Sequence, residues 1–367
     1  MTRKASPMTQ AMRPLAIAGL IVAMTASLTT ASSASSAGWT SVKLPSGTAQ
    51  SLSFNSVSCV GTKCLAVGYP CAPAGCGGSI PSQVFVSSNA GASWRLVPIA
   101  ATYTTLSSLV CATATRCLVV AEKLVGDSSE LVILRSLTGG ASWSPVALPS
   151  GFSPYRVTCP TASTCWSVGS RTSSAMAAVA RTSNFGNRWV QVNAPTGVGT
   201  LSAVACSSAA RCLVVSGGAT PQSASVRLTL NGGATWRAVA TPPGFGSFGA
   251  IACTNVRHCV MVGYSMAAVS TDGGLTWSSR SVPKTASLFA VSCASSARCI
   301  AVGQFTPVSG PPAVFMTTNG GASWVAQSVP TASPGLLNAV SCGTLHCVSV
   351  GYVSPSVTSA SPFMIRD

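Results

Sequence analysis

An eight-residue segment that ends in tryptophan recurs along the chain and constrains its fold more than any other feature. We call each copy a box. The six boxes end at Trp94, Trp143, Trp189, Trp236, Trp277 and Trp324, at spacings of 41 to 49 residues. A period of this size is typical of propellers and solenoids, in which each repeat is one supersecondary unit. We therefore expect most of the 367-residue chain to be built from copies of one small unit.

Pairs of cysteines alternate with the boxes. Each pair follows an alternating run such as Ala290-Val291-Ser292-Cys293, and its second cysteine opens a Cys-hydrophobic-x-Val-Gly pattern or a close variant. We interpret each pair as a disulfide that closes a tight hairpin turn between the first two strands; zinc binding is the alternative, but further Cys or His ligands are missing from the spacing. Seven pairs alternate in this way: Cys59/Cys64, Cys111/Cys117, Cys159/Cys165, Cys206/Cys212, Cys253/Cys259, Cys293/Cys299 and Cys342/Cys347. The remaining two cysteines, Cys71 and Cys76, are expected to staple an inserted loop.

Each repeat has room for four short strands. In the sixth repeat they are expected at residues 287–293, 299–303, 313–317 and 323–329, which are β-branched or alternating and are bounded by Gly, Pro, Ser or Asn. Four strands in roughly 47 residues make one propeller blade. No 11-residue window beyond the first segment shows the 3.6-residue period of an amphipathic helix.

The two ends of the repeat region complement each other. Residues 363–367 align with residues 315–319, so the sequence ends at the third position of a box, and Gly38-Trp39-Thr40 matches the end of a box. Closing the ring in this way removes a large open sheet edge. We predict an all-β protein: a seven-bladed β-propeller of four-stranded antiparallel blades, closed by the N-terminal strand, which completes the C-terminal blade.

Residues 1–37 have the layout of a secretory signal peptide. Arg3, Lys4 and Arg13 precede an apolar run, and Ser35-Ser36-Ala37 permits cleavage before Gly38. An uncleaved anchor is the alternative, but the run is shorter than the roughly 20 residues that a span needs. Sixteen cysteines also favour an oxidising compartment. We predict a signal at 1–37, one propeller domain at 38–367 without a membrane span, and a secreted or extracytoplasmic monomer.

The boxes have a shared local chemistry. The third position is Asn, Thr or Asp, whose short side chain is expected to accept backbone N–H bonds. The glycine three residues before the tryptophan is expected to adopt a positive φ, and the tryptophan is expected to be buried. Calcium binding would need several carboxylates per site, and Asp272 is the only acidic residue in the six boxes.

The segment Ser270-Thr271-Asp272-Gly273-Gly274-Leu275-Thr276-Trp277 fits the pattern Ser-x-Asp-x-Gly-x-Thr-Trp at every position, and the other boxes fit it with Asn or Thr for Asp. The boxes thus resemble the Asp-box, or BNR, repeat. Proteins with this repeat are β-propellers and include sialidases, other glycoside hydrolases, sortilin-type receptors and photosystem II stability/assembly factors. The resemblance implies that the box is a structural turn remote from any active site, so it predicts fold and not activity.

Acidic residues are too few for most hydrolytic mechanisms. Asp and Glu number five against 21 Lys and Arg. Asp272 and Asp367 occupy box positions, while Glu122, Asp127 and Glu130 fall in one loop, and glycosidases need two carboxylates across the scissile bond. We therefore expect no catalytic residues, no metal and no cofactor. The alternatives are a divergent sialidase-like glycoside hydrolase that uses Glu122, Asp127 or Glu130, and a carbohydrate-binding lectin.

Cations recur just before the second cysteine of the pairs. They are Lys63, Arg116, Arg211, His258, Arg298 and His346, with Thr164 as the exception. In a propeller these turns share one face, so the cations are either solvated turn residues or an anion-attracting ring. Loss of residues 1–37 leaves a net charge of +13, which favours the second interpretation.

The opposite face is where propellers usually bind ligands. Tyr69, Tyr264 and Tyr352 follow a Val-Gly that is expected to end a strand, and Tyr155 falls in or near another loop of that face. These rings either stack on a sugar or anchor a peptide, or they pack the loops. We predict a binding or scaffold module for a protein or cell-envelope partner, with an anionic glycan as second choice and no nucleic acid, because scattered cations make no dedicated groove.

Overall fold

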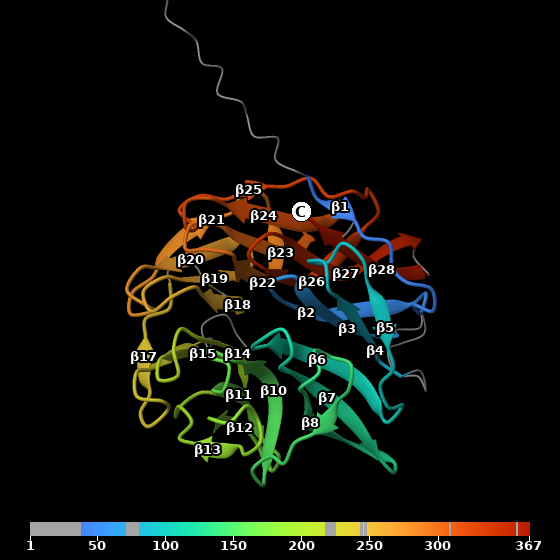
Figure 1. Ribbon diagram of the computed structural model, residues 1–367. Helices are drawn as coiled ribbons and strands as arrows, with labels where there is room; N and C mark the ends of the chain where they lie inside the picture. The colour runs from blue at the N-terminus through green and yellow to red at the C-terminus, as the bar shows by residue number, and fades with distance from the viewer. Residues whose placement is uncertain are drawn as a thin grey trace, which may run out of the picture. The chain divides into compact units, whose positions relative to one another are not determined.

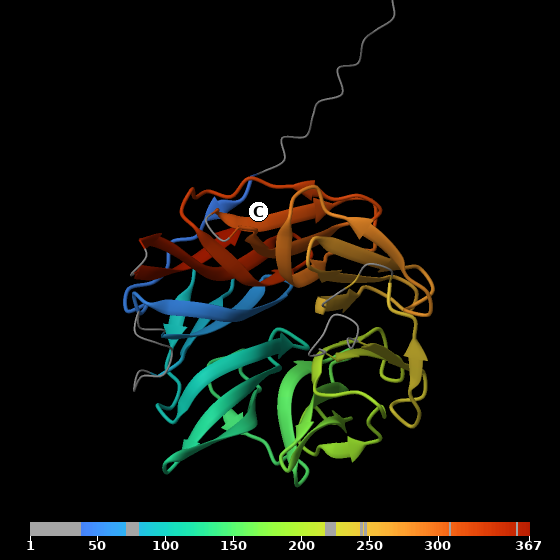
Figure 2. The ribbon, with the colours of Figure 1, turned by 180° about the vertical axis from the view of Figure 1, so that it is seen from behind.

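The computed structural model is a ring of seven four-stranded antiparallel sheets, the blades of a propeller (Figure 1, Figure 2). It describes residues 38–70, 81–216, 225–242, 245, 248–307, 310–356 and 359–367. The predicted signal segment, 1–37, and the predicted Cys71–Cys76 pair lie outside the described residues. The predicted all-β, seven-bladed architecture is confirmed.

Each blade contributes one strand to each of four positions, counted from the centre of the ring outward. The innermost strands are β2 (Leu52–Val60), β6 (Tyr103–Cys111), β10 (Phe152–Thr158), β14 (Leu201–Cys206), β18 (Phe248–Cys253), β22 (Ala286–Cys293) and β26 (Gly335–Cys342). The second strands are β3 (Lys63–Pro70), β7 (Cys117–Val125), β11 (Cys165–Arg171), β15 (Cys212–Ser216), β19 (Cys259–Gly263), β23 (Cys299–Phe305) and β27 (Cys347–Ser356). The third strands are β4 (Gln83–Ser87), β8 (Ser128–Ser136), β12 (Ser174–Thr182), β16 (Ser225–Thr229), β20 (Met266–Ser270), β24 (Pro312–Thr317) and β28 (Ser359–Arg366). The outer strands are β5 (Arg95–Val97), β9 (Ser144–Pro145), β13 (Val190–Val192), β17 (Arg237–Val239), β21 (Ser278–Ser281), β25 (Val325–Ala326) and β1 (Thr40–Ser41).

The seventh blade is completed by residues from the other end of the described chain. Strand β1 pairs with β28, and the Val42 N–H donates to the Met364 carbonyl at 2.9 Å. Trp39 is buried in the same cluster as Ile300 of the sixth blade. Figure 1 shows the blue β1 beside the red β28. The predicted closure by the N-terminal strand is therefore confirmed.

A β-bulge in every innermost strand explains the repeated Val-Gly of the second strands. The inner-strand register shifts in all seven blades, for example between Leu288 and Ala290. The bulge brings the inner backbone close to the second strand, where a Cβ on Gly303 would overlap the carbonyl oxygen of Ser287. Gly169 meets Ser153 in the same way, so only glycine fits there without a shift.

Serines of the innermost strands link neighbouring blades. The Ser58 hydroxyl accepts the Cys111 N–H of the next blade at 2.9 Å. The Ser292 hydroxyl accepts the Cys342 N–H at 3.0 Å, and Ser341 makes the equivalent bond across the closure. The serine of the Ala-Val-Ser-Cys pattern therefore accepts a backbone N–H of the adjacent blade. An apolar residue at that position could not accept this bond.

The boxes form the turns predicted from their sequence. In the first box, the Ser87 hydroxyl accepts the Gly91 N–H at 3.0 Å, and the Asn89 side-chain oxygen accepts the Ser93 N–H at 2.9 Å. Both bonds recur in the other five boxes. The glycine three residues before each tryptophan has a φ between 78° and 90°, as expected.

Each box packs on the blade that precedes its own. Gly140 faces Leu65, Gly274 faces Leu213, and the Cβ that Ala would add at either glycine would overlap the leucine side chain. The leucines follow the second cysteine of a pair, so box and cystine hairpin of adjacent blades meet. Apolar side chains fill the remaining space between adjacent sheets in clusters shared by two blades.

The fourth strand is shorter than its sequence suggests. Strand β25 covers Val325–Ala326, whereas residues 323–329 were expected. Ser323 and the buried Trp324 belong to the box turn, and Gln327 adds only one further bond, from its N–H to the Val314 carbonyl at 2.8 Å. The alternation of the sequence continues beyond the residues that pair.

Replacing Trp39 by Ala should weaken the closure of the ring. Trp39 and Trp324 are 7% and 5% exposed, so Trp39→Ala and Trp324→Ala remove similar contacts, each costing about 3–5 kcal/mol. Only Trp39 lies in the blade whose strands come from both ends of the chain. We expect faster hydrogen exchange in β28 and β26 for Trp39→Ala than for Trp324→Ala, measured by mass spectrometry. Equal protection of β28 in the two variants would contradict the closing role.

A methyl group at the inner bulge should destabilise the blade. Gly303→Ala places a Cβ against the Ser287 carbonyl and should lower the free energy of unfolding by about 1–3 kcal/mol or more. Gly199→Ala is the matched control, because nothing lies within 4 Å of a Cβ there. Urea unfolding measures both, and equal stabilities would show that the bulge does not require glycine.

Candidate functional site

The ring has two faces of different chemistry. The cystine face carries the turns between first and second strands and the boxes; the loop face carries the hairpins between second and third strands and the connections between blades. All seven predicted disulfides of the repeats are formed on the cystine face, with Cα–Cα distances of 3.9–4.1 Å. So many disulfides are typical of an oxidising, extracytoplasmic compartment.

The second cysteine of each pair is buried. Cys64 bonds to Cys59 as predicted, but it is only 1% exposed and packs in the cluster that contains Phe54 and Trp94. It is the second residue of β3 and its side chain packs in the interior, so it belongs to the core and not to a surface site. The second cysteines of the other pairs are buried in the same way: Cys117, Cys165, Cys212, Cys259, Cys299 and Cys347. These cysteines are structural residues that no ligand at the surface can reach.

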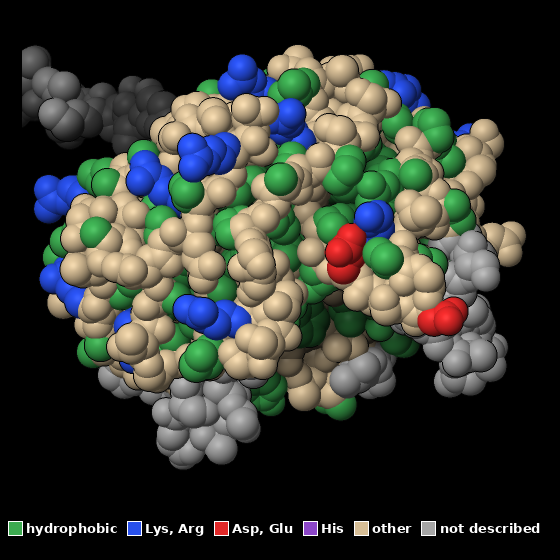
Figure 3. Space-filling view, turned by 90° about the horizontal axis from the view of Figure 1, so that it is seen from below, with side chains coloured by type: hydrophobic (Ala, Val, Ile, Leu, Met, Phe, Trp, Pro, Cys, Tyr) green, Lys and Arg blue, Asp and Glu red, His purple; other side chains and the backbone are tan. Residues whose placement is uncertain are grey.

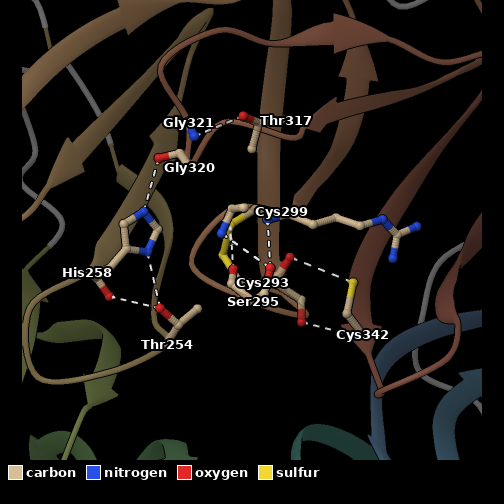
Figure 4. The surroundings of a disulfide bond; sticks show 12 residues. Thr254, His258, Cys293, Ser295, Cys299, Thr317, Gly320, Gly321 and Cys342 are labelled. Carbon is tan, nitrogen blue, oxygen red and sulfur yellow. Dashed lines mark hydrogen bonds between the residues drawn. A yellow bond between two sulfur atoms is a disulfide. The ribbon is translucent and has the colours of Figure 1, made fainter.

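Cations of the cystine face reach the box of the next blade. Arg211 donates from Nε to the Gly273 carbonyl at 3.0 Å and from Nη2 to the Asp272 carbonyl at 2.7 Å. His258 is buried, and its Nε2 lies 3.0 Å from the Gly320 carbonyl (Figure 4). Because a carbonyl only accepts, this nitrogen carries a proton, and Nδ1 lies 3.2 Å from the Thr254 hydroxyl.

Two further predicted cations also contact the adjacent blade. The Lys63 side chain approaches the second box at Gly139, and burial together with the charge of Arg95 lowers the pKa of Lys63. The Arg116 guanidinium lies 5.7 Å from the centre of the Phe185 ring in the third box. Each cation therefore sits where a box of the next blade passes.

The box position of the seventh blade holds a charged cluster. Arg298 of the sixth blade forms an ion pair with the Asp367 carboxylate, which also accepts the Cys347 N–H at 2.6 Å. His346 lies with Nδ1 2.7 Å from the Asp367 carbonyl. Alignment of Asp367 with the third box position was the one sequence signal for this cluster.

Sequence reasoning missed two arginines that make equivalent contacts. Arg366 donates from Nε to the Ala90 carbonyl of the first box at 2.9 Å. Arg181 lies over the Trp166 ring at 5.6 Å and beside the fourth box, in the blade whose turn has Thr164 instead of a cation. Both come from third strands, which the turn pattern does not cover. These contacts are those of structural residues, and anion binding at the cystine face stays a prediction.

The one acidic box has a perturbed carboxyl group. Burial by itself would raise the pKa of Asp272, but hydrogen bonds from Thr276, Ser270 and Leu275 outweigh it and lower the pKa to about 2. The Thr276 hydroxyl donates at 2.6 Å and the Leu275 N–H at 2.9 Å. The carboxylate is thus held as an acceptor within its own turn.

The remaining acidic side chains lie together on the β7–β8 hairpin. Glu122 accepts from the Thr105 hydroxyl at 2.9 Å, and Glu130 pairs with Lys123 at 3.1 Å. Asp127 lies at the exposed tip of the hairpin. With Asp272 and Asp367 these are all five acidic residues of the sequence, so the acidic side chains of different blades do not face one another across the ring. Figure 3 shows one side of the molecule, where Lys and Arg are scattered and acidic side chains are few.

The described residues contain no group of three or more His, Cys, Asp or Glu side chains placed to hold a metal ion. Within the same residues, no helix is long and apolar enough to cross a membrane.

The four predicted tyrosines come from four different blades. Tyr264 is 52% exposed in the β19–β20 turn of the loop face. Tyr69 and Tyr352 are half-buried inside β3 and β27, so the expected strand end at Val-Gly is wrong in those two blades. Tyr155 is the bulge residue of β10 rather than a loop residue, and its hydroxyl bonds to that of Ser170 at 2.9 Å.

A cavity of about 290 Å³ lies beside this bulge. Its walls come from the second, third and fourth blades: Ser107, Val120, Leu131, Pro154, Tyr155, Arg156, Thr200, Leu201 and Ser202. Arg156 is exposed to solvent, yet the protein around it desolvates its guanidinium and lowers its pKa. One sequence feature distinguishes Arg156: at its position, three residues before the first cysteine of the pair, the other blades have Ser or Ala.

A closed ring of seven four-stranded antiparallel blades is a seven-bladed β-propeller, and two solved structures share this fold. A structure described as YCF48 bound to D1 peptide matches with a TM-score of 0.62 and 14% identity, covering 89% of this chain and 94% of that chain. YCF48 from Cyanidioschyzon merolae matches with a TM-score of 0.61 and 14% identity, covering 90% and 98%. A GH74 enzyme of Niastella koreensis matches at a TM-score of only 0.39, with 11% identity over 84% and 65%, which is too low to bear on activity. No protein-family model and no curated protein matches the chain.

Replacing Asp272 by Asn should remove one source of acid sensitivity. The folded pKa of about 2 lies below the ordinary value near 3.9, so the carboxylate adds stability above pH ~4 and loses it as pH falls toward 2. Asn keeps the acceptor oxygen, as in Asn231 of another box. We expect the stability difference between wild type and Asp272→Asn to be constant above pH ~5 and to shift in favour of Asn between pH ~4 and ~2. Urea midpoints over this range measure it, and a pH-independent difference would contradict the assignment.

Proposed function

We propose that the chain is a non-catalytic binding module, exported by the segment 1–37 and active on a protein partner outside the cytoplasm. The placement of the five acidic residues carries the proposal. Two are bound in box positions and three share one hairpin, so the pair of opposed carboxylates that glycoside hydrolysis requires is not assembled between blades.

A protein partner is supported by the propeller likeness. YCF48, whose fold this chain shares, has been solved with a bound D1 peptide. Propellers of this kind present loops and inner strand ends on one face, and here the exposed Tyr264 and the cavity beside Tyr155 lie toward that face. Tyrosine supplies large contact area at low conformational cost, which suits recognition of a peptide or protein.

An anionic glycan is the second candidate, favoured by the net positive charge. The cystine-face cations are less suited to it than the sequence suggests. Arg211, His258 and Arg298 already bond to boxes of adjacent blades, so part of their donor capacity is used.

Site-specific photocrosslinking tests the proposal. A photoreactive phenylalanine analogue at Tyr264 samples the loop face, and the same analogue at Leu345, which is 66% exposed in a cystine-face turn, is the matched control. In cells that produce the full chain, we expect a discrete protein adduct from position 264 and none from 345. Adducts from 345 alone, or no protein adduct from either position together with salt-sensitive retention on an anionic polysaccharide, would overturn the proposal in favour of the cystine face or of a glycan.

A further inference from the structure

Arg156 differs chemically from the residues at the same position in the innermost strands of the other blades. The residues at its position in the other blades, three before the first cysteine of each pair, are Ser56, Ser108, Ala203, Ala250, Ala290 and Ala339. Ser56 and Ser108 accept backbone N–H groups of the next blade and so join blades together. An arginine cannot accept such a bond, because the guanidinium has donors only. Its role therefore differs from that of its counterparts.

The guanidinium of Arg156 has little to bond to within the described protein. Its one hydrogen bond there runs from Nη1 to the carbonyl of the adjacent Tyr155, at 3.0 Å. None of the ion pairs includes it, and each of the five acidic residues of the chain has a place in a box or on the β7–β8 hairpin. Other cations of the ring, such as Arg211 and Arg298, bond to a neighbouring blade. Arg156 has donors available for a ligand.

The cavity around Arg156 combines apolar walls with hydroxyl groups. Val120, Leu131 and Leu201 supply aliphatic surface, and Ser107 and Ser202 supply hydroxyls. A volume of about 290 Å³ lies at the low end of the range for small-molecule sites. It suits a single group on a short aliphatic stem rather than a folded element. The serine hydroxyls bond to carbonyls of their own blades, at Val120 for Ser107 and at Val215 for Ser202, which leaves their oxygens as acceptors and the guanidinium as the main donor.

We propose that this cavity binds a carboxylate carried on an aliphatic stem and presented by an extended segment of a protein partner. The inference rests on the proposed function and names the group that the partner inserts. A guanidinium binds a carboxylate through two parallel N–H bonds, which are stronger than bonds between neutral groups. The stem packs on Val120, Leu131 and Leu201.

The physical environment supports an anionic ligand. The protein around Arg156 lowers the pKa of its guanidinium through desolvation, but an arginine stays charged at neutral pH. A partly desolvated cation without a counter-charge is unfavourable, and a bound carboxylate offsets that cost. The hydroxyl of Tyr155 is held by Ser170, so the ring beside the guanidinium is positioned before a ligand arrives.

Two sources of carboxylate share this chemistry, and small blocked peptides separate them. Acetyl-leucyl-glutamate amide carries only an acidic side chain, whereas acetyl-alanyl-leucine carries only a free chain terminus. Acetyl-leucyl-glutamine amide is the neutral match, and isovalerate is a free carboxylate without a peptide. The full propeller, labelled with ¹⁵N in its arginine side chains, is titrated with each probe while the Arg156 Nε–H signal is followed by NMR. We expect weak, saturable binding of one or both acidic peptides and none of the neutral one.

Variants locate the effect. Arg156→Gln should weaken binding of the acidic peptide at least about tenfold in ligand-observed NMR, because a charged hydrogen-bond donor is lost. Arg156→Lys should retain part of the affinity, since a charge without the planar fork remains. Arg171→Gln is the matched control, because Arg171 is exposed in the same blade but lies outside the cavity lining.

Several outcomes would overturn the inference. They are an unmoved Arg156 signal with every probe, equal binding of the neutral peptide, equal losses in Arg156→Gln and Arg171→Gln, and isovalerate binding as tight as that of the peptides. The last outcome indicates a site for a free small carboxylate. Failure here is distinguishable from failure of the proposed function: if Arg156→Gln leaves binding of the acidic peptides unchanged while the crosslinked adduct at Tyr264 still forms, the protein partner stands and the cavity assignment falls.

Discussion

The contact between each box and the blade before it is the interaction on which the rest of the structure depends. A glycine with positive φ lets the box lie flat on the side chain after the second cysteine of the neighbouring hairpin, as Gly140 does on Leu65. The disulfide fixes that hairpin, and a cation such as Arg211 reaches over to the box carbonyls. Each blade packs its box on the preceding blade and receives the box of the following blade. To complete the ring, the seventh blade therefore also needs residues at its box position. Asp367 and Trp39, from opposite ends of the described chain, fill it together.

The contacts that the cystine-face cations make with adjacent blades bear on which surface we propose as a binding site. Arginines and histidines that a sequence pattern places on one face suggest an anion site, but the structure commits their donors to the next blade. Among the described residues, Arg156 has no such bond to a neighbouring blade, and it lies within β10 beside a cavity. The repeated residues hold the ring together, and Arg156, which departs from the repeat, lines the cavity that we propose as a binding site.

Most of the fold was readable from the sequence, because the boxes and the cysteine pairs are local patterns with local causes. Closure was also readable, since the end of the chain aligns with the middle of a box and Trp39 aligns with its end. The inner bulges could not be predicted, because a register shift depends on hydrogen bonding between strands, and Tyr155 was therefore expected in or near a loop. The full length of the second strands was also not predicted, so Tyr69 and Tyr352 were expected after strand ends. The bonds of Arg211 and His258 to another blade could not be predicted without the relative position of the sheets. The same holds for the burial of Cys64 between two sheets. Arg156 was visible as a departure from Ser or Ala, but its cavity was not.

Arginine modification in the native protein tests this division of roles most directly. Phenylglyoxal reacts with accessible guanidinium groups, and mass spectrometry reads each site. We predict that Arg156, with its single bond to a neighbouring carbonyl, reacts in the native protein, while Arg211 and Arg298, which are bound to adjacent blades, react only after reduction and unfolding. Native reaction of Arg211 and Arg298 at the rate of the exposed Arg171, with Arg156 protected, would contradict it.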